Sequence, residues 1–115
     1  MLGKSTDTCF VYVIECSCNK KRYVGVTKHI ENRRLAHLYA LRSGRHCNKA
    51  LQSDFNSYGE NNFSFSVIGT TTVKDRSQSE KRWIEKYKSH LEEYGYNFHD
   101  QKFYPRIKSR LRKEE

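Results

Sequence analysis

Two short runs of sequence decide how this chain folds: CFVYVI at residues 9–14 and RYVGV at residues 22–26. Both runs are rich in β-branched and aromatic residues, which favour strands. The polar segment between them, residues 17–21, contains Asn19, a residue that suits a turn. The pattern predicts a β-hairpin, in which Gly25 marks a close approach of the backbone or a bulge.

The segments that follow predict two helices, a third strand and a third helix. Residues 30–43 contain neither glycine nor proline and stop at a glycine, and residues 48–58 begin with a capping asparagine and also stop at a glycine. Residues 63–67, FSFSV, alternate apolar residues with serine as strands do, whereas residues 77–91 favour a helix. The order β-β-α-α-β-α predicts an α+β fold with a small three-stranded antiparallel sheet flanked by helices.

The length of 115 residues supports one domain. We expect residues 1–8 to be a loose N-terminal leader, residues 9–98 to be the folded domain and residues 99–115 to be a basic C-terminal tail. The leader lacks the apolar stretch of a signal peptide, and no apolar run is long enough to span a membrane. We therefore expect a protein of the cytoplasm, or of the host-cell cytoplasm if a phage encodes it, that is neither secreted nor membrane-bound.

The charge balance is strongly basic, with 22 Lys and Arg against 13 Asp and Glu and a formal net charge of +9. Such an excess favours polyanionic partners, nucleic acid first and acidic membrane surfaces second. The chain is also rich in tyrosine, whose rings can stack on bases. Charge alone is weak evidence, because many small basic proteins use it only for solubility.

The four cysteines leave two interpretations open. A zinc site normally has ligand pairs at C-x₂₋₄-C spacing, but Cys16 and Cys18 are separated by one residue. His46 and Cys47 form the other plausible pair. Free reduced thiols are the better interpretation, and structural zinc is the alternative.

Two of the expected helices, residues 30–43 and 77–91, carry charged or titratable side chains that could take part in catalysis. Arg33 and His37 lie four residues apart and so share a helical face, where they could bind a phosphate and assist proton transfer, or simply form a solvated basic face. Glu80 lies on the apolar stripe of its own helix, which is costly for a carboxylate unless it has a partner or a metal. The alternative is a capping box in residues 77–80, SQSE, in which Glu80 turns back to the helix N-terminus.

Tyr12 and Tyr23 lie in the paired strands, where aromatic residues are common because they pack well. A phenol with a pKa near 10 is a poor base unless a nearby cation helps to remove its proton. Tyrosine, arginine and a glutamate-held metal are nevertheless a coherent set for the attack of water on a phosphate.

The order and intervals of these motifs resemble those of the GIY-YIG nucleases. The matching segments are FVY at 10–12, YVG at 23–25, ENRRLAH at 31–37, SGRHCNKALQ at 43–52, EKRWI at 80–84 and GYN at 95–97. One departure is Phe10, which replaces the glycine that is usual in the first motif. No core catalytic residue is lost, so we do not infer inactivity.

The resemblance implies a role for each matched residue. Glu80 would hold one divalent cation, Mg²⁺ or Mn²⁺, and either Tyr12 or Tyr23 would position or deprotonate the attacking water. Arg33 would stabilise the charge that develops on the phosphate, His37 would assist proton transfer and Asn97 would orient the site. His46 stands where histidine is frequent in phage homing enzymes, although a solvated loop histidine remains the alternative.

Nucleic-acid contacts must come from the domain, from a partner protein or oligomer that supplies specificity, or from the tail. The candidate contact residues are His46, Lys49, Arg106, Lys108, Arg110 and Arg112. Such basic side chains would bind phosphates without reading sequence. A solvated terminus is the alternative for the tail.

These inferences predict a metal-dependent DNA endonuclease of the stand-alone phage or homing type. A structure-specific nuclease of repair or recombination is the first alternative. A non-catalytic nucleic-acid-binding module that kept the fold is the second. RNA is not excluded as the substrate, and we expect no membrane partner.

Overall fold

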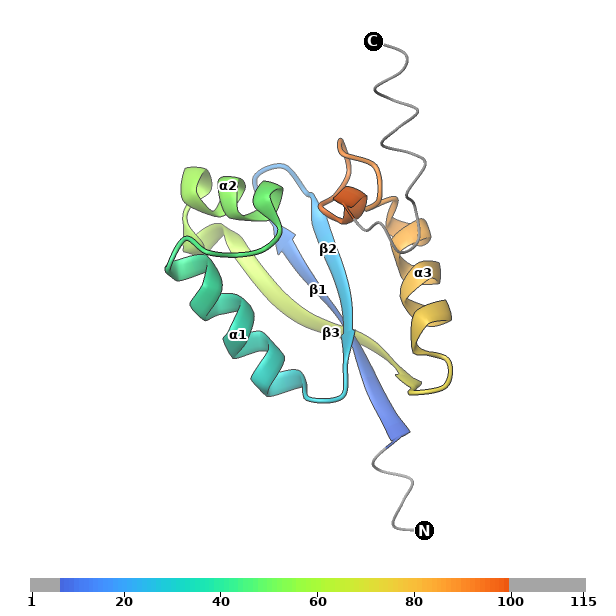
Figure 1. The fold of residues 1–115 in the computed structure, drawn as a ribbon. Coiled ribbons are helices and arrows are strands. Elements are labelled where there is room, and N and C mark those ends of the chain that lie inside the picture. The colour runs from blue at the N-terminus through green and yellow to red at the C-terminus, as the bar shows by residue number, and fades with distance from the viewer. Residues whose placement is uncertain (1–6, 100–115) are drawn as a thin grey trace.

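A computed structural model describes residues 7–99 of the chain, and it confirms the α+β fold expected from the sequence (Figure 1). Three strands form one sheet, and helices lie on both of its faces. The elements are β1 (Thr8–Cys16), β2 (Arg22–Thr27), α1 (Ile30–Arg42), α2 (Lys49–Tyr58), β3 (Phe63–Thr72) and α3 (Arg76–Tyr87), with short 3₁₀ turns η2 (Glu60–Asn62) and η3 (Asn97–His99).

The sheet is antiparallel, and its strand order is β2-β1-β3. The central strand β1 pairs with β2 through the predicted hairpin, so that Tyr12 stands opposite Gly25. The pairing of β1 with β3 is irregular between Val11 and Tyr12, whose partners are Gly69 and Val67. This bulge adds one residue to β3 and changes which of its side chains face the core.

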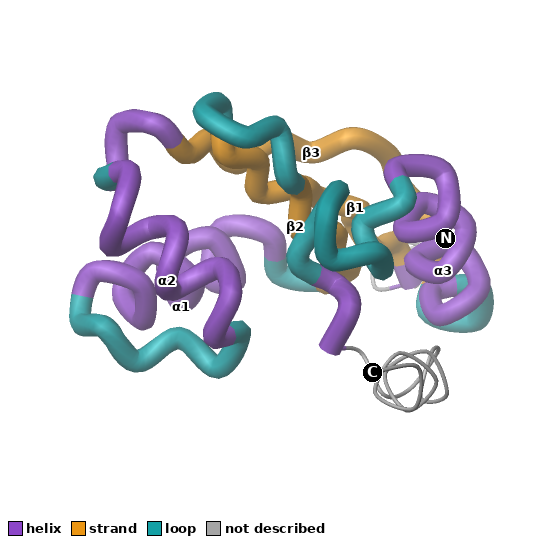
Figure 2. The backbone as a smooth tube through the Cα atoms, turned by 90° about the horizontal axis from the view of Figure 1, so that it is seen from above, coloured by secondary structure: helices purple, strands orange, loops and turns teal. Residues whose placement is uncertain are grey.

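Alternation along β1 sends its side chains to two separate cores, one on each side of the sheet between the helical layers seen in Figure 2. On one face α1 and α2 pack on the sheet, and on the other face α3 does so. The first core contains Tyr12, Ile14, Cys16, Leu41, Leu51, Phe55 and Tyr96. The second contains Cys9, Val11, Val13, Val24, Val26 and Ile84. Each fully buried aliphatic side chain contributes roughly 1.5–3 kcal/mol, so the two cores rather than helix propensity hold the layers together.

The ends of the helices follow local signals. Asn48 caps α2, because its side-chain oxygen accepts a hydrogen bond from the Leu51 amide at 3.0 Å. Gly44 and Gly59 follow α1 and α2 with positive φ angles of 75° and 89°, which glycine adopts without strain. The helix expected over residues 77–91 is shorter, since α3 ends at Tyr87 and Lys88 takes a left-handed conformation with φ 58°.

The expected leader and tail fall largely outside the described residues. The tail residues Arg106, Lys108, Arg110 and Arg112 all lie there, so their proposed contacts with nucleic acid remain predictions. Within residues 7–99, no helix combines the length and apolar character that crossing a membrane requires.

Candidate active site

The hydroxyl of Tyr12 lies over Gly25, its cross-strand partner on β2. A Cβ atom placed on Gly25 would stand 2.3 Å from the Tyr12 oxygen and 2.4 Å from its Cζ. The glycine is therefore needed for space, as the hairpin pattern suggested. On its other side, the Tyr12 ring stacks on Phe65 with ring centroids 4.9 Å apart, so the ring is held from two directions.

A chain of hydrogen bonds runs from Tyr12 through two histidines to the start of α2. The Tyr12 oxygen lies 2.7 Å from Nε2 of His37, and Nδ1 of His37 lies 2.8 Å from Nε2 of His46. The backbone N–H of Asn48 then donates to Nδ1 of His46 at 3.0 Å. We call these four residues the histidine chain. The sequence left His46 open between the site and a solvated loop, and the structure buries it, with 5% of its surface exposed.

Burial keeps both histidines neutral near pH 7. Burial, with smaller contributions from the neighbouring His46 and Arg33, lowers the pKa of His37 to about 4. Burial also lowers the pKa of His46. Neither imidazole therefore carries a positive charge under ordinary conditions, and each has one N–H and one acceptor nitrogen.

Tyr23 lies against both histidines, and both tyrosines have raised pKa values. The Tyr23 ring meets the rings of His37 and His46 edge-on, with centroids 5.6 and 6.5 Å apart. Burial raises the pKa of Tyr12, and the hydrogen bond and charge of Arg33 partly oppose that shift. Burial also raises the pKa of Tyr23, to which the Tyr12 hydroxyl adds. Both phenols are consequently neutral, and their chemistry begins from the protonated form.

Glu80 approaches this group from the opposite helical layer. Its negative charge raises the pKa of both Tyr12 and Tyr23, in addition to the effect of burial. The capping box proposed for residues 77–80 is wrong, because the N-cap of α3 is Asp75 and Glu80 stands one full turn inside the helix. Glu80 therefore lies beyond the N3 position that a capping box requires, and its charge acts on the two tyrosines.

Asn97 has a buried position behind the site. Its side chain accepts a hydrogen bond from the Val24 amide at 2.8 Å and donates one to the Val24 carbonyl at 3.1 Å. Ser89 donates to the same Asn97 oxygen at 2.8 Å. The amide thus pairs with the free edge of β2 next to Tyr23, which makes Asn97 a positioning residue for that strand. Gly95 allows this approach, since a Cβ there would stand 2.3 Å from the Ser89 Cα.

The donor set fits a cation held jointly by the protein and its substrate. Among residues 7–99 no group of three or more His, Cys, Asp or Glu side chains is arranged to hold a metal ion. Mg²⁺ commonly binds through one or two carboxylates and completes its shell with waters and substrate phosphates. Glu80, whose charge acts on both phenols, suits that mode. The zinc alternative is not supported, because Cys16 is buried in the first core whereas Cys18 is exposed.

Two contributors to the site, Gln52 and Cys47, had no clear catalytic signal in the sequence. Gln52 accepts the His46 backbone N–H at 2.9 Å and donates to the Leu41 carbonyl at 3.0 Å, so it fixes the loop that carries His46. A charge on Cys47 would raise the pKa of both tyrosines, so this exposed thiol belongs to the same region of the fold. Lys49 is exposed at the first position of α2, adjacent to the Asn48 cap.

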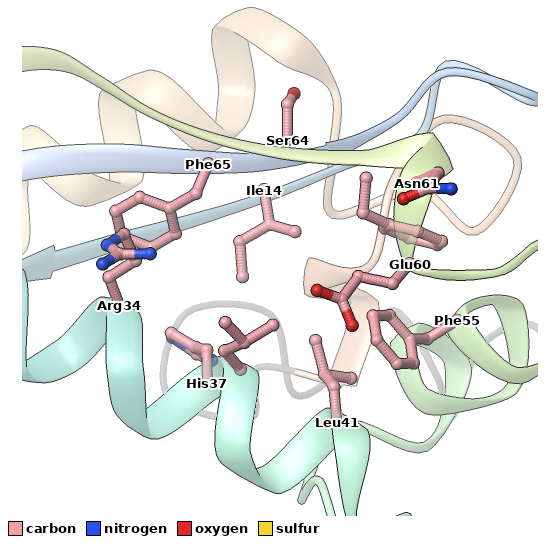
Figure 3. Close-up of a pocket in the computed structure, with 11 residues that line it drawn as sticks. Ile14, Arg34, His37, Leu41, Phe55, Glu60, Asn61, Ser64 and Phe65 are labelled. Atoms are coloured by element: carbon pink, nitrogen blue, oxygen red, sulfur yellow. The ribbon is translucent and has the colours of Figure 1, made fainter.

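A cavity of about 440 Å³ borders the histidine chain between α1 and β3 (Figure 3). His37 and Leu41 enter it from α1, and Ile14 and Phe65 enter it from the sheet. Its wall is mainly apolar and aromatic. Of the histidine chain, His37 is the residue that also lines this cavity.

Comparison with known proteins identifies the family to which this set of site residues belongs. A sequence profile of the GIY-YIG catalytic domain matches residues 8–97. The chain belongs to the GIY-YIG family. No curated protein matched the sequence significantly. Among solved structures, this GIY-YIG domain is similar to the catalytic domain of intron endonuclease I-TevI in a variant in which a glutamate is replaced by alanine. The identity is 30% and the TM-score 0.70, over 79% of this chain and 93% of that one.

A second structure, described as the catalytic domain of homing endonuclease I-TevI, matches at 29% identity with a TM-score of 0.69, over 76% of this chain and 96% of that chain. The fold of this chain is thus that of a homing-endonuclease catalytic domain. Membership of the family implies endonuclease activity on nucleic acid.

Proposed function

We propose that this chain is a metal-dependent DNA endonuclease of the stand-alone phage or homing type, which hydrolyses phosphodiester bonds. The observation that carries the proposal is that the Tyr12 hydroxyl on β1 lies 2.7 Å from Nε2 of His37 on α1, where Arg33 from α1 lowers the pKa of this hydroxyl and Glu80 from α3 raises it. A carboxylate, a guanidinium and neutral phenols at one point are the groups that phosphodiester hydrolysis needs.

Each residue has a role that follows from its surroundings. Arg33 is exposed and positively charged, so it can meet a phosphate and stabilise the charge that develops there. Tyr12 or Tyr23 positions the attacking water, and His37 serves proton transfer beside Tyr12. Asn97 keeps the edge of β2, and with it Tyr23, in place.

Glu80 is the proposed ligand of a divalent cation, Mg²⁺ or Mn²⁺. Such a cation, when bound, would supply Lewis acidity toward the scissile phosphate. The chain itself contributes the carboxylate, and its basic residues offset the charge of the incoming phosphate. Because a single carboxylate binds the cation weakly, we expect substrate and metal to stabilise each other's binding.

Affinity for the substrate should come from basic side chains that contact phosphates. We propose Lys49, at the start of α2, together with the tail residues Arg106, Lys108, Arg110 and Arg112, and we divide the chain into leader (1–8), nuclease domain (9–98) and tail (99–115). His46 is buried within the histidine chain, so its part in binding is to support Tyr12 rather than to contact phosphate. Binding should weaken steeply as salt rises, and a partner protein or oligomer would supply sequence specificity.

A cleavage assay tests the proposal. The full chain is incubated with supercoiled plasmid, linear duplex, branched DNA and RNA, with and without Mg²⁺, beside Glu80→Ala and the control Glu85→Ala. Glu85 lies on the same helix but is exposed, so its replacement changes charge equally without touching the site. We expect Mg²⁺-dependent products from the wild type and from Glu85→Ala but none from Glu80→Ala, with circular dichroism confirming the fold.

The same assay separates the alternatives. Products that persist unchanged in Glu80→Ala would refute the mechanism. Preferential cutting of branched over linear duplex would select a structure-specific repair or recombination nuclease. Tight binding without cleavage in either Mg²⁺ or Mn²⁺ would select a non-catalytic binding module.

A further inference from the structure

The histidine chain has a direction that its geometry determines. The Asn48 N–H donates to Nδ1 of His46, and a ring nitrogen that accepts a hydrogen bond carries no hydrogen of its own. The single hydrogen of neutral His46 is therefore on Nε2, which faces Nδ1 of His37 at 2.8 Å. That nitrogen accepts in turn, so the hydrogen of His37 is on Nε2 and points to the Tyr12 oxygen at 2.7 Å.

The opposite direction is incompatible with the same contacts. If the Tyr12 hydroxyl donated to His37, the hydrogen of His37 would move to Nδ1 and His46 would have to accept it at Nε2. The hydrogen of His46 would then lie on Nδ1, where it would face the Asn48 N–H, and two donors would meet at 3.0 Å. A buried N–H without an acceptor is strongly disfavoured.

The backbone amide that determines this direction is held on every side. The Asn48 side chain donates to the Tyr96 carbonyl at 2.7 Å, and its oxygen accepts from the Leu51 amide at 3.0 Å. Gln52 holds the backbone of His46 at 2.9 Å. The amide cannot rotate away without breaking these contacts, so it presents its N–H to His46 permanently.

We propose that the Asn48 backbone N–H is a positioning group that sets the tautomers of His46 and His37, so that Tyr12 receives a hydrogen bond from His37 and keeps its own hydrogen for another acceptor. Because His37 already donates to this oxygen, the phenolic hydrogen is what the hydroxyl can offer a phosphate or water oxygen. His37 consequently acts toward Tyr12 as a hydrogen-bond donor before substrate binds.

This inference rests on the proposed function for its consequence in catalysis, but its structural part is measured without substrate. Long-range ¹H–¹⁵N spectra of the full chain at pH 7 distinguish a protonated ring nitrogen from a bare one. We expect Nε2 protonated and Nδ1 bare in both His37 and His46, in the absence of DNA and metal. A hydrogen on Nδ1 of either histidine would overturn the proposal.

Two substitutions at residue 48 isolate the amide. Asn48→Ala and Asn48→Pro both remove the side-chain contacts, but only proline also removes the N–H, and the φ of −86° at this position is close to what proline adopts. We expect Asn48→Ala to keep the tautomers, because the N–H remains and Gln52 still holds the backbone of His46, whereas Asn48→Pro should populate the Nδ1–H form of His46. At saturating DNA, kcat of Asn48→Pro should fall roughly fivefold below that of Asn48→Ala, the size of one net hydrogen bond, with little change in KM.

The outcomes separate the two proposals. Equal kcat in the two variants despite altered tautomers would refute the catalytic role of the amide. Expected tautomers in a wild-type protein that cuts no nucleic acid would refute the proposed function while the tautomer assignment stands. If Asn48→Pro does not fold, the wild-type spectra still decide the tautomers.

Discussion

Gly25→Ala tests whether the space above β2 positions the Tyr12 hydroxyl. The new Cβ would stand 2.3 Å from that oxygen, which no real contact tolerates, and Gly25 lies on a strand whose register with β1 is fixed on both sides. Tyr12 must therefore move. Its ring is stacked on Phe65 and its oxygen is bonded to His37, so any movement loses one of these contacts.

The expected cost follows from three contributions. Overpacking a core position costs about 1–3 kcal/mol, and the lost Tyr12–His37 hydrogen bond costs about 1 kcal/mol. Replacing glycine by alanine in a strand returns about 0.5–1 kcal/mol. The net destabilisation is about 2 kcal/mol, which for a domain of this size lowers Tm by about 10 °C.

The matched control is Gly69→Ala on β3. A Cβ there would stand 3.5 Å from the Trp83 ring, an ordinary van der Waals distance. Thermal unfolding and the plasmid cleavage rate are measured for both variants at a temperature where both are folded. We expect Gly25→Ala to lose Tm and at least roughly tenfold in cleavage rate, because small misplacements of reacting groups are costly. If Gly25→Ala behaves like Gly69→Ala, the claim that this glycine positions Tyr12 is incorrect.

Two further predictions concern the histidine chain and the thiol beside the tyrosines. The pKa of His37 is about 4 in the folded protein against 6.5 in the unfolded chain, so its stabilising effect is present above pH 6.5 and is lost as the pH falls toward 4. Allowing for partial exposure of His37, urea unfolding of the wild type should give a free energy of unfolding about 1–2 kcal/mol lower at pH 5 than at pH 7. The His37→Gln variant should show a smaller loss between the same two pH values. An equal loss in both proteins would exclude His37 as the source of the pH dependence. Alkylation of exposed Cys47 should reduce cleavage roughly tenfold or more, because the adduct occupies space beside Tyr12 and Tyr23. The activity of Cys47→Ser should resist the alkylating reagent. The control Cys18→Ser, which removes the other exposed thiol, should remain sensitive. If Cys18→Ser is protected instead, Cys47 does not lie near the two tyrosines.

Local signals predicted most of the fold because they act within a few residues. The hairpin followed from strand-forming residues around a polar turn, and the start and end of α2 followed from Asn48 and Gly59. The same kind of local reasoning failed at residues 77–80. Their letters match a capping box, but β3 continues to Thr72 and the turn after it starts α3 at Arg76. The position of a helix start depends on the strand before it, which a four-residue pattern does not contain.

The strand pattern of β3 predicted which side chains share a face but not how deeply each one is buried. Phe63 and Phe65 face the first core as their alternation with serine predicts, but Val67 is 50% exposed. Val67 keeps the alternation, because it pairs with Tyr12 as Phe65 pairs with Ile14, but the pattern does not tell how far the helices cover this edge strand; the bulge comes after Val67, before Gly69 pairs with Val11. A bulge arises from the pairing of two strands, so it leaves no periodic signal in either strand alone.

By itself the sequence determined the order of elements, the family resemblance and the residue types available for chemistry, since each depends on neighbours along the chain. Only the tertiary structure decided how the hairpin works, because the partners of its residues are remote in sequence. Tyr12 meets a histidine 25 residues away, and Val24 on the same hairpin is bonded by an asparagine 73 residues away. The direction of the hydrogen bond from His37 to Tyr12 depends on the backbone N–H of Asn48. Nearly every residue type has this N–H, so the sequence gives no sign of its role.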